Sequence, residues 1–187
     1  ADRAQMQVLR KRADIVIMGA STLRAYQKFC GVRGARPQRQ PANAIISHGL
    51  EGVSSDLPFF ADPKLRRILF VTHPLSAARQ KAFGRGSEIV QLKPHGAPIA
   101  AQLIAALKKR GFESILVEGG GGLMWDFASR NLIDEYHVTL TPKIVGGRES
   151  PTLVEGAGFS PAEILELKLI RCKKLGDELY LTYRRRK

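Results

Sequence analysis

The residues best placed to do chemistry are four successive glycines, Gly119 to Gly122, which follow Glu118 and an apolar run at 114–117. The apolar run predicts a buried strand, and the residues from Leu123 onward predict a helix. Glycine allows a tight turn between them, and backbone N–H groups at a helix start can bind an anion. The pattern therefore favours a pyrophosphate-binding loop. A structural turn without a ligand is the alternative, because the spacing differs from the GxGxxG fingerprint.

Hydroxyl side chains follow three other predicted strands. Thr22 comes shortly after the first apolar run, while Ser47 with His48 and Thr72 with His73 come directly after two later runs. Ligands of open α/β sheets bind at the carboxyl ends of the strands, so these side chains are candidates for contacts with a cofactor. The two histidines could contact a 2′-phosphate. The alternatives are helix capping by Thr22 and solvated loop histidines.

Basic residues are concentrated at the two ends of the chain. The sequence carries 30 Lys and Arg against 17 Asp and Glu, a net charge of +13. Residues 1–40 contribute +7 and residues 171–187 contribute +5, whereas residues 41–170 contribute only +1. Such ends could be solvated tails, a nucleic-acid surface or a pocket for a phosphorylated substrate. Nucleic-acid binding is the weakest of the three, because the basic stretch 24–39 holds only two aromatic residues for stacking.

The composition excludes several classes of protein. With 187 residues, 44% hydrophobic and 25% charged, the chain has the balance of one globular domain. No apolar run approaches the length of a membrane span, and no signal-peptide core follows Ala1, so we expect a cytoplasmic protein. Cys30 and Cys172 lack the spacing of a metal site, and no metal is expected. The H-x-E and P-C-x-x-C pattern of zinc deaminases is also absent.

Hydrophobic patterning predicts an α/β fold. A continuous apolar run predicts a buried strand at 15–18, and further apolar segments predict strands at 44–46, 68–71, 88–92 and 114–117. Helical spacing predicts helices at 2–13, 76–83, 99–110 and 123–131. Later alternation predicts antiparallel strands at 136–140, 166–170 and 179–183. We therefore expect a single domain over 1–187, with three layers, a mostly parallel central sheet and antiparallel C-terminal strands.

Five segments, taken in order, resemble the reductase domain of the riboflavin-biosynthesis deaminase-reductase family, which has a dihydrofolate-reductase-like fold. They are Leu9-Arg10 with Ala13-Asp14, Gly19-x-x-Thr22-Leu23-x-Ala25, Pro41 with Ala44-Ile45-Ile46-Ser47, Val117-Glu118-Gly119-Gly120 with Leu132-Ile133-Asp134-Glu135, and Thr141-Pro142-Lys143-Ile144-Val145-Gly146-Gly147. The resemblance runs from Leu9 to about Leu181. It also implies that the first strand of the family's fold would precede Ala1.

The resemblance implies an NADPH-dependent oxidoreductase that reduces the ribosyl group of a 5-amino-6-(5-phosphoribosylamino)uracil-type pyrimidine to ribityl by hydride transfer. It further implies a homodimer built through the C-terminal strands. By position, Glu118 would be catalytic, at the ribose or nicotinamide end of the cofactor. The substrate phosphate would be bound by Arg10, Arg33, Arg36 and Arg39, a geometry that suits guanidinium groups. The cofactor would be contacted by Gly19, Thr22, Ser47, Thr72, Gly119, Gly120, Gly121 and Gly122.

One departure from the family's pattern bears on the substrate. The family usually carries acidic residues and a proline where this chain has Tyr26, Gln27 and Lys28. An alternative is therefore a dihydrofolate-reductase-like reductase of another heterocyclic substrate. A second alternative, from a different class, is a basic nucleic-acid-binding module that reuses the fold.

Overall fold

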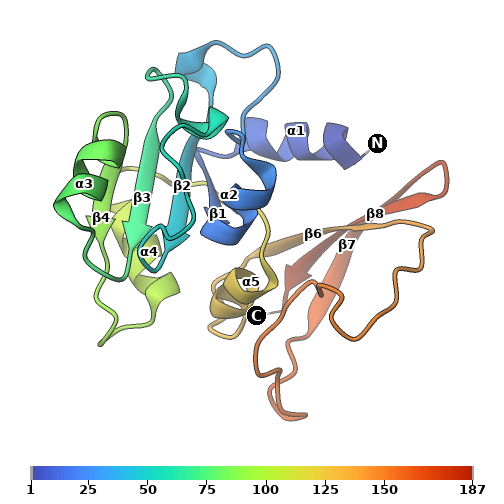
Figure 1. Cartoon of the computed structure of the whole chain (residues 1–187). Helices are drawn as coiled ribbons and strands as arrows, with labels where there is room; N and C mark the ends of the chain where they lie inside the picture. The colour runs from blue at the N-terminus through green and yellow to red at the C-terminus, as the bar shows by residue number, and fades with distance from the viewer. Residues whose placement is uncertain (1, 187) are drawn as a thin grey trace. The chain divides into compact units, whose positions relative to one another are not determined.

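The computed structural model describes residues 2–186, which fall into two compact units. The first unit contains residues 3–120, and the second contains residues 121–186 together with residue 2. The elements of the first unit, shown in Figure 1, are α1 (Asp2–Arg12), β1 (Ile15–Gly19), α2 (Ala20–Tyr26), η1 (Pro37–Arg39), β2 (Ala42–Ser47), η2 (Pro58–Phe60), β3 (Arg67–Val71), α3 (Ala77–Gly84), β4 (Glu88–Gln91), α4 (Ile99–Lys108) and β5 (Ile115–Val117).

The first unit is built on a parallel sheet of five strands in the order β4-β3-β2-β1-β5. Ile15 of β1 lies opposite Ala42 of β2 on one side and Ile115 of β5 on the other. The chain moves outward from β1 to β4 and then returns through α4 to β5. Because crossovers between parallel strands are right-handed, this reversal places α4 on the face opposite α3. Both faces are thereby covered, which explains the apolar runs of the central strands β1 and β3.

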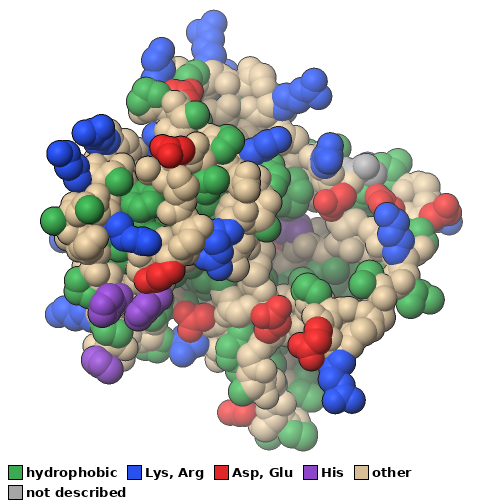
Figure 2. Space-filling model, in the orientation of Figure 1, with side chains coloured by type: hydrophobic (Ala, Val, Ile, Leu, Met, Phe, Trp, Pro, Cys, Tyr) green, Lys and Arg blue, Asp and Glu red, His purple; other side chains and the backbone are tan. Residues whose placement is uncertain are grey.

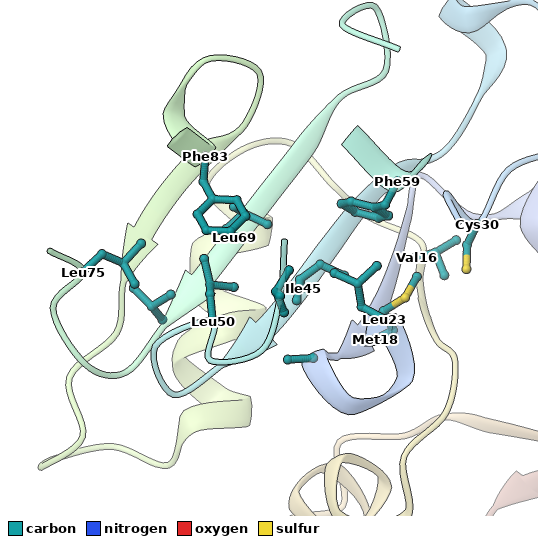
Figure 3. Packing of buried hydrophobic residues seen from close by; sticks show 13 residues of the cluster. Val16, Met18, Leu23, Cys30, Ile45, Leu50, Phe59, Leu69, Leu75 and Phe83 are labelled. Atoms are coloured by element: carbon teal, nitrogen blue, oxygen red, sulfur yellow. The ribbon is translucent and has the colours of Figure 1, made fainter. Parts of the chain in front are cut away.

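One side of the sheet carries a large hydrophobic cluster (Figure 3). Alternate residues of three neighbouring strands point into it and meet side chains from α2, α3 and the loops. Its fully or almost fully buried members include Val16, Met18, Leu23, Cys30, Ile45, Leu50, Phe59, Leu69 and Phe83. This cluster fixes the sheet against α2, and therefore fixes the start of α2 at the carboxyl edge of the sheet.

The amide of Asn43 ties β2 to the segment that follows α2. Asn43 is fully buried, and its Oδ1 accepts a hydrogen bond from the Cys30 backbone N–H at 2.7 Å. Its Nδ2 donates to the carbonyls of Cys30 at 3.2 Å and of Ala42 at 3.0 Å. A buried polar group is tolerated only when it is bonded in this way.

The second unit pairs three antiparallel strands in the order β6-β8-β7. Its elements are α5 (Gly121–Ala128), β6 (Glu135–Leu140), β7 (Leu167–Leu175) and β8 (Glu178–Arg185). A register shift interrupts the pairing of β7 with β8 between Leu169 and Arg171. Residues 141–166, between β6 and β7, form no helix or strand. Most of β7 is exposed.

The predicted α/β class, with a parallel sheet and antiparallel C-terminal strands, is confirmed. The antiparallel strands, however, bond to one another in a separate sheet and are not an edge of the parallel one. Helix α5 begins at Gly121, two residues before the predicted start, and β7 runs on to Leu175. The short helices η1 and η2 were not predicted, since each occupies only three residues beginning with proline. Of the helices described, none is long and apolar enough to cross a membrane.

Replacement of Asn43 by alanine is expected to lower the free energy of unfolding by about 2–4 kcal/mol, because it orphans buried backbone groups around Cys30. Gln38→Ala is a matched control, since Gln38 is an exposed amide in η1. Urea denaturation of both variants measures the difference. An Asn43→Ala variant as stable as Gln38→Ala would contradict the prediction.

Candidate active site at the carboxyl edge of the parallel sheet

The carboxyl ends of four neighbouring strands bring the predicted cofactor residues of the first unit to one edge. Gly19 ends β1 and Thr22 lies in α2 directly after it. Ser47 ends β2, and Thr72 follows β3. Glu118, Gly119 and Gly120 follow β5. Because β3, β2, β1 and β5 are adjacent in the sheet, these residues form a row along the edge. Gly121 and Gly122 belong to the second unit.

The winding of the chain reverses between β1 and β5, and the loops after these two strands approach each other. A Cβ atom at Gly119 would lie 3.4 Å from Cγ2 and 3.5 Å from Oγ1 of Thr22. Gly119 and Gly120 both have φ +83°, a conformation that other residues rarely adopt. Both glycines are exposed. The reversal point of an open parallel sheet is where ligands bind, and here it offers backbone N–H groups without side chains.

A nearly buried ion pair lies immediately before this loop. Nε of Arg10 donates to Oε1 of Glu118 at 2.7 Å, and Nη2 donates to Oε2 at 2.6 Å. The two side chains are 9% and 10% exposed. Burial lowers the pKa of Arg10, but the hydrogen bonds and charge of Glu118 outweigh it, so the net pKa lies above the ordinary value. Arg10 is therefore a permanent cation that occupies both carboxylate oxygens of Glu118.

Cys30 lies beside this pair as a neutral thiol. It is 3% exposed, and its pKa is raised to about 12 by burial and by the neighbouring carboxylate of Glu118. The thiolate is the reactive form of cysteine, so this residue is inert at neutral pH. Its place is fixed by Asn43, which bonds both backbone groups of Cys30.

Three of the four arginines predicted to bind a phosphate are exposed. Arg33, Arg36 and Arg39 lie in or beside the loop that leads into β2. Gln40 closes this loop, because its side chain accepts from Val32 N–H at 2.6 Å and donates to Val32 and Ala35 carbonyls. The fourth, Arg10, is nearly buried, and two nitrogens of its guanidinium group donate to Glu118.

In the second unit, Gly121 and Gly122 are in contact with a residue that sequence reasoning missed. A Cβ atom at Gly121 would collide with the side chain of Glu155, and one at Gly122 would lie 4.0 Å from its Oε2. The Glu155 N–H also donates to the Gly121 carbonyl at 3.1 Å. A carboxylate near the start of α5 is favoured by the helix dipole. The close contact with Glu155 thus explains why this position is occupied by glycine.

The four-glycine run therefore divides into two pairs with different surroundings. Gly119 and Gly120 are exposed and Gly119 faces Thr22, whereas Gly121 packs on Glu155. Glu155 gave no signal in the sequence, because residues 141–166 have neither helical nor strand periodicity. Within residues 2–186, no group of three or more His, Cys, Asp or Glu side chains could hold a metal ion.

Over residues 1–181 the sequence matches the protein family described as the RibD C-terminal domain. The chain belongs to this family. It is 30% identical over 176 residues to the 2,5-diamino-6-ribosylamino-4(3H)-pyrimidinone 5′-phosphate reductase of Aquifex aeolicus, covering 91% of this chain and 77% of that protein. It is 32% identical over 188 residues to the protein of the same name from Archaeoglobus fulgidus, covering 94% of this chain and 81% of that one. The family resemblance predicted from the five segments is confirmed.

Solved structures have the same fold as this RibD C-terminal domain. RibD of Acinetobacter baumannii superposes with a TM-score of 0.79 at 19% identity, covering 99% of this chain but 50% of that one. A pyrimidine reductase-like protein from Corynebacterium diphtheriae gives 0.78 at 21% identity, covering 100% of this chain and 81% of that one. This chain thus spans about half the length of the RibD structure and most of the length of the reductases.

Removing one partner of the Arg10–Glu118 pair is expected to lower the free energy of unfolding more than replacing both partners by apolar residues. Arg10→Met leaves a nearly buried carboxylate without its cation and should lower the free energy of unfolding by about 3–5 kcal/mol. The double variant Arg10→Met, Glu118→Met should recover most of this loss, because no uncompensated charge remains. Urea denaturation of the wild type, both single variants and the double variant gives the coupling free energy. Additive losses would contradict the prediction.

The thiol of Cys30 should resist labelling while the protein is folded. In a Cys172→Ser variant, we expect no reaction with a thiol reagent at about pH 8 until denaturant is added. The thiol ionises near 9.0 in the unfolded chain and near 12 in the folded one, so stability is retained below pH 9.0 and falls as pH rises toward 12. Rapid labelling of folded Cys172→Ser would refute this.

Proposed function

We propose that this chain is an NADPH-dependent reductase of riboflavin biosynthesis. It reduces the ribosyl group of a ribosylaminopyrimidine 5′-phosphate to a ribityl group. The named relatives support this function, since they are reductases of such a compound and match over 91% and 94% of this chain. As a member of a reductase family, the chain is an oxidoreductase that requires a nicotinamide coenzyme. That this coenzyme is NADPH is part of the proposal.

The observation that carries the proposal is the exposed Gly119–Gly120 backbone at the reversal point of the sheet, where Gly119 faces Thr22. A pyrophosphate suits this loop, because N–H groups are its only donors and a Cβ would fill the space. Gly19, Ser47 and Thr72 extend the same edge and offer backbone and hydroxyl donors to the rest of the coenzyme. Contact of Gly121 and Gly122, in the second unit, with the coenzyme stays a prediction.

In this proposal the substrate phosphate is bound mainly by the exposed guanidinium groups of Arg33, Arg36 and Arg39. Guanidinium forks match the oxygens of a phosphate dianion, and these three groups face solvent. Binding by Arg10 stays a prediction, since two of its nitrogens already donate to Glu118. The bound coenzyme supplies a hydride to C1′ of the ribosyl group.

Glu118 acts in this proposal by positioning the coenzyme loop. Both of its oxygens accept hydrogen bonds from Arg10, which hold the carboxylate in one orientation. A direct catalytic role of Glu118 stays a prediction. The loop that follows Glu118 is aligned by the same ion pair.

The proposed activity is tested by following loss of NADPH absorbance with either of two substrates. These are 2,5-diamino-6-ribosylamino-4(3H)-pyrimidinone 5′-phosphate and its deaminated uracil counterpart, which differ only on the pyrimidine ring. Turnover of at least one supports the proposal. Saturable NADPH binding without turnover of either would favour another heterocyclic substrate. Salt-sensitive binding of duplex DNA without NADPH binding would overturn the proposal in favour of a nucleic-acid module.

Gly120→Asp tests the coenzyme loop. Any side chain at Gly120 is strained because its φ is +83°, so Gly120→Ala serves as the matched control. The aspartate adds a negative charge against the pyrophosphate, and we expect an NADPH Kd roughly tenfold or more above that of Gly120→Ala. Calorimetric titration measures both. Equal Kd values would show that the loop does not bind the pyrophosphate.

A single domain over 1–187, a homodimer and a cytoplasmic location all stay predictions. The exposed strand β7 is a candidate dimer surface, since the family resemblance placed the contact at the C-terminal strands. Gel filtration with light scattering tests the homodimer.

A further inference from the structure

The loop that carries Arg33, Arg36 and Arg39 has little regular structure of its own. Within residues 31–39 only η1 forms a regular element, and Gly34 has φ +74°. Figure 2 shows Lys and Arg side chains projecting from the surface at the top, where Figure 1 has the light-blue segment that contains η1. An unrestrained loop would lose conformational entropy when a phosphate fixed its arginines, and this loss would weaken binding.

Gln7 of α1 bonds the start of this loop. Its Nε2 donates to the Gly31 carbonyl at 3.1 Å, and its Oε1 accepts from the Arg33 N–H at 2.6 Å. The Gly31 carbonyl also accepts from Nη1 of Arg10 at 3.4 Å. Because both polar atoms of the Gln7 amide are used, the backbone of Arg33 is fixed relative to α1.

Gln40, just before β2, bonds the middle of the loop. Its Oε1 accepts from the Val32 N–H at 2.6 Å, and its Nε2 donates to the carbonyls of Val32 at 2.9 Å and Ala35 at 3.0 Å. The Ala35 carbonyl belongs to the peptide group that leads into Arg36. A Cβ atom at Gly31 would lie 2.7 Å from Oε1 of Gln40, so Gly31 leaves the space that this amide needs.

The chemistry of both anchors suits a loop that binds an anion. A glutamine amide offers donors and an acceptor, so it can satisfy backbone N–H and C=O groups of one loop together. A carboxylate in either place would offer acceptors alone and would repel a phosphate. The two amides thus hold the backbone while the arginine side chains of the loop stay exposed.

We propose that Gln7 and Gln40 are positioning residues for the substrate phosphate, which hold residues 31–39 in the binding conformation before the substrate arrives. The inference rests on the proposed function, since it depends on the assignment of the phosphate to the arginines of this loop. Such pre-organisation adds affinity because less conformational entropy is lost on binding. Its effect belongs in the KM of the substrate and not in kcat or in the Kd for NADPH.

The test compares the 5′-phosphate that the enzyme reduces with the same compound lacking its phosphate, at saturating NADPH. In Gln7→Ala and in Gln40→Ala, the KM for the phosphorylated compound should rise roughly tenfold, while kcat and the NADPH Kd change by less than about twofold. The kcat/KM for the compound without phosphate should stay within about twofold of the wild-type value. Gly31→Ala displaces the Gln40 amide without removing it and should also raise the KM for the phosphorylated compound.

Gln5→Ala and Gln38→Ala are the matched controls. Gln5 lies two residues before Gln7 on α1, so its side chain points about 200° away around the helix. Gln38 is an exposed amide of η1, between Arg36 and Arg39. Both variants should keep the wild-type KM. Urea denaturation shows that every variant is folded under the conditions of the assay.

The outcomes separate this inference from the proposed function. If the wild type turns over and both glutamine variants keep its KM, the inference is wrong and the proposed function stands. The same conclusion follows if kcat/KM falls equally for the compounds with and without phosphate, because the glutamines would then support the fold as a whole. If the wild type oxidises no NADPH with the phosphorylated compound, the proposed function is wrong and the inference falls with it.

Discussion

The ion pair between Arg10 and Glu118 joins the first helix of the parallel unit to its last strand. The two residues are 108 positions apart in sequence, and the pair draws α1 against the end of β5. Taking both charges out of water costs free energy, which bidentate geometry at 2.7 and 2.6 Å offsets. Because Glu118 directly precedes Gly119, the same pair sets where the glycine loop begins. The open backbone at the sheet edge therefore depends on it.

The order of the strands explains why the remaining candidate residues lie in a row. All five strands are parallel, so every loop that follows a strand emerges at the same edge. The winding of the chain reverses between β1 and β5, where Thr22 and Gly119 face each other. Ser47, at the end of β2, and Thr72, after β3, extend the row along the same edge.

The sequence predicted the elements whose burial dictates their composition. Strands buried on both faces need continuous apolar runs, so β1 and β3 could be recognised from hydrophobicity alone. The start of α5 was missed because glycine has low helix propensity, and the contact of Gly121 with Glu155 overrides that preference. Partners distant in sequence could not be predicted. The residue type of Arg10 indicated an anionic partner, but only the fold shows that the anion is Glu118.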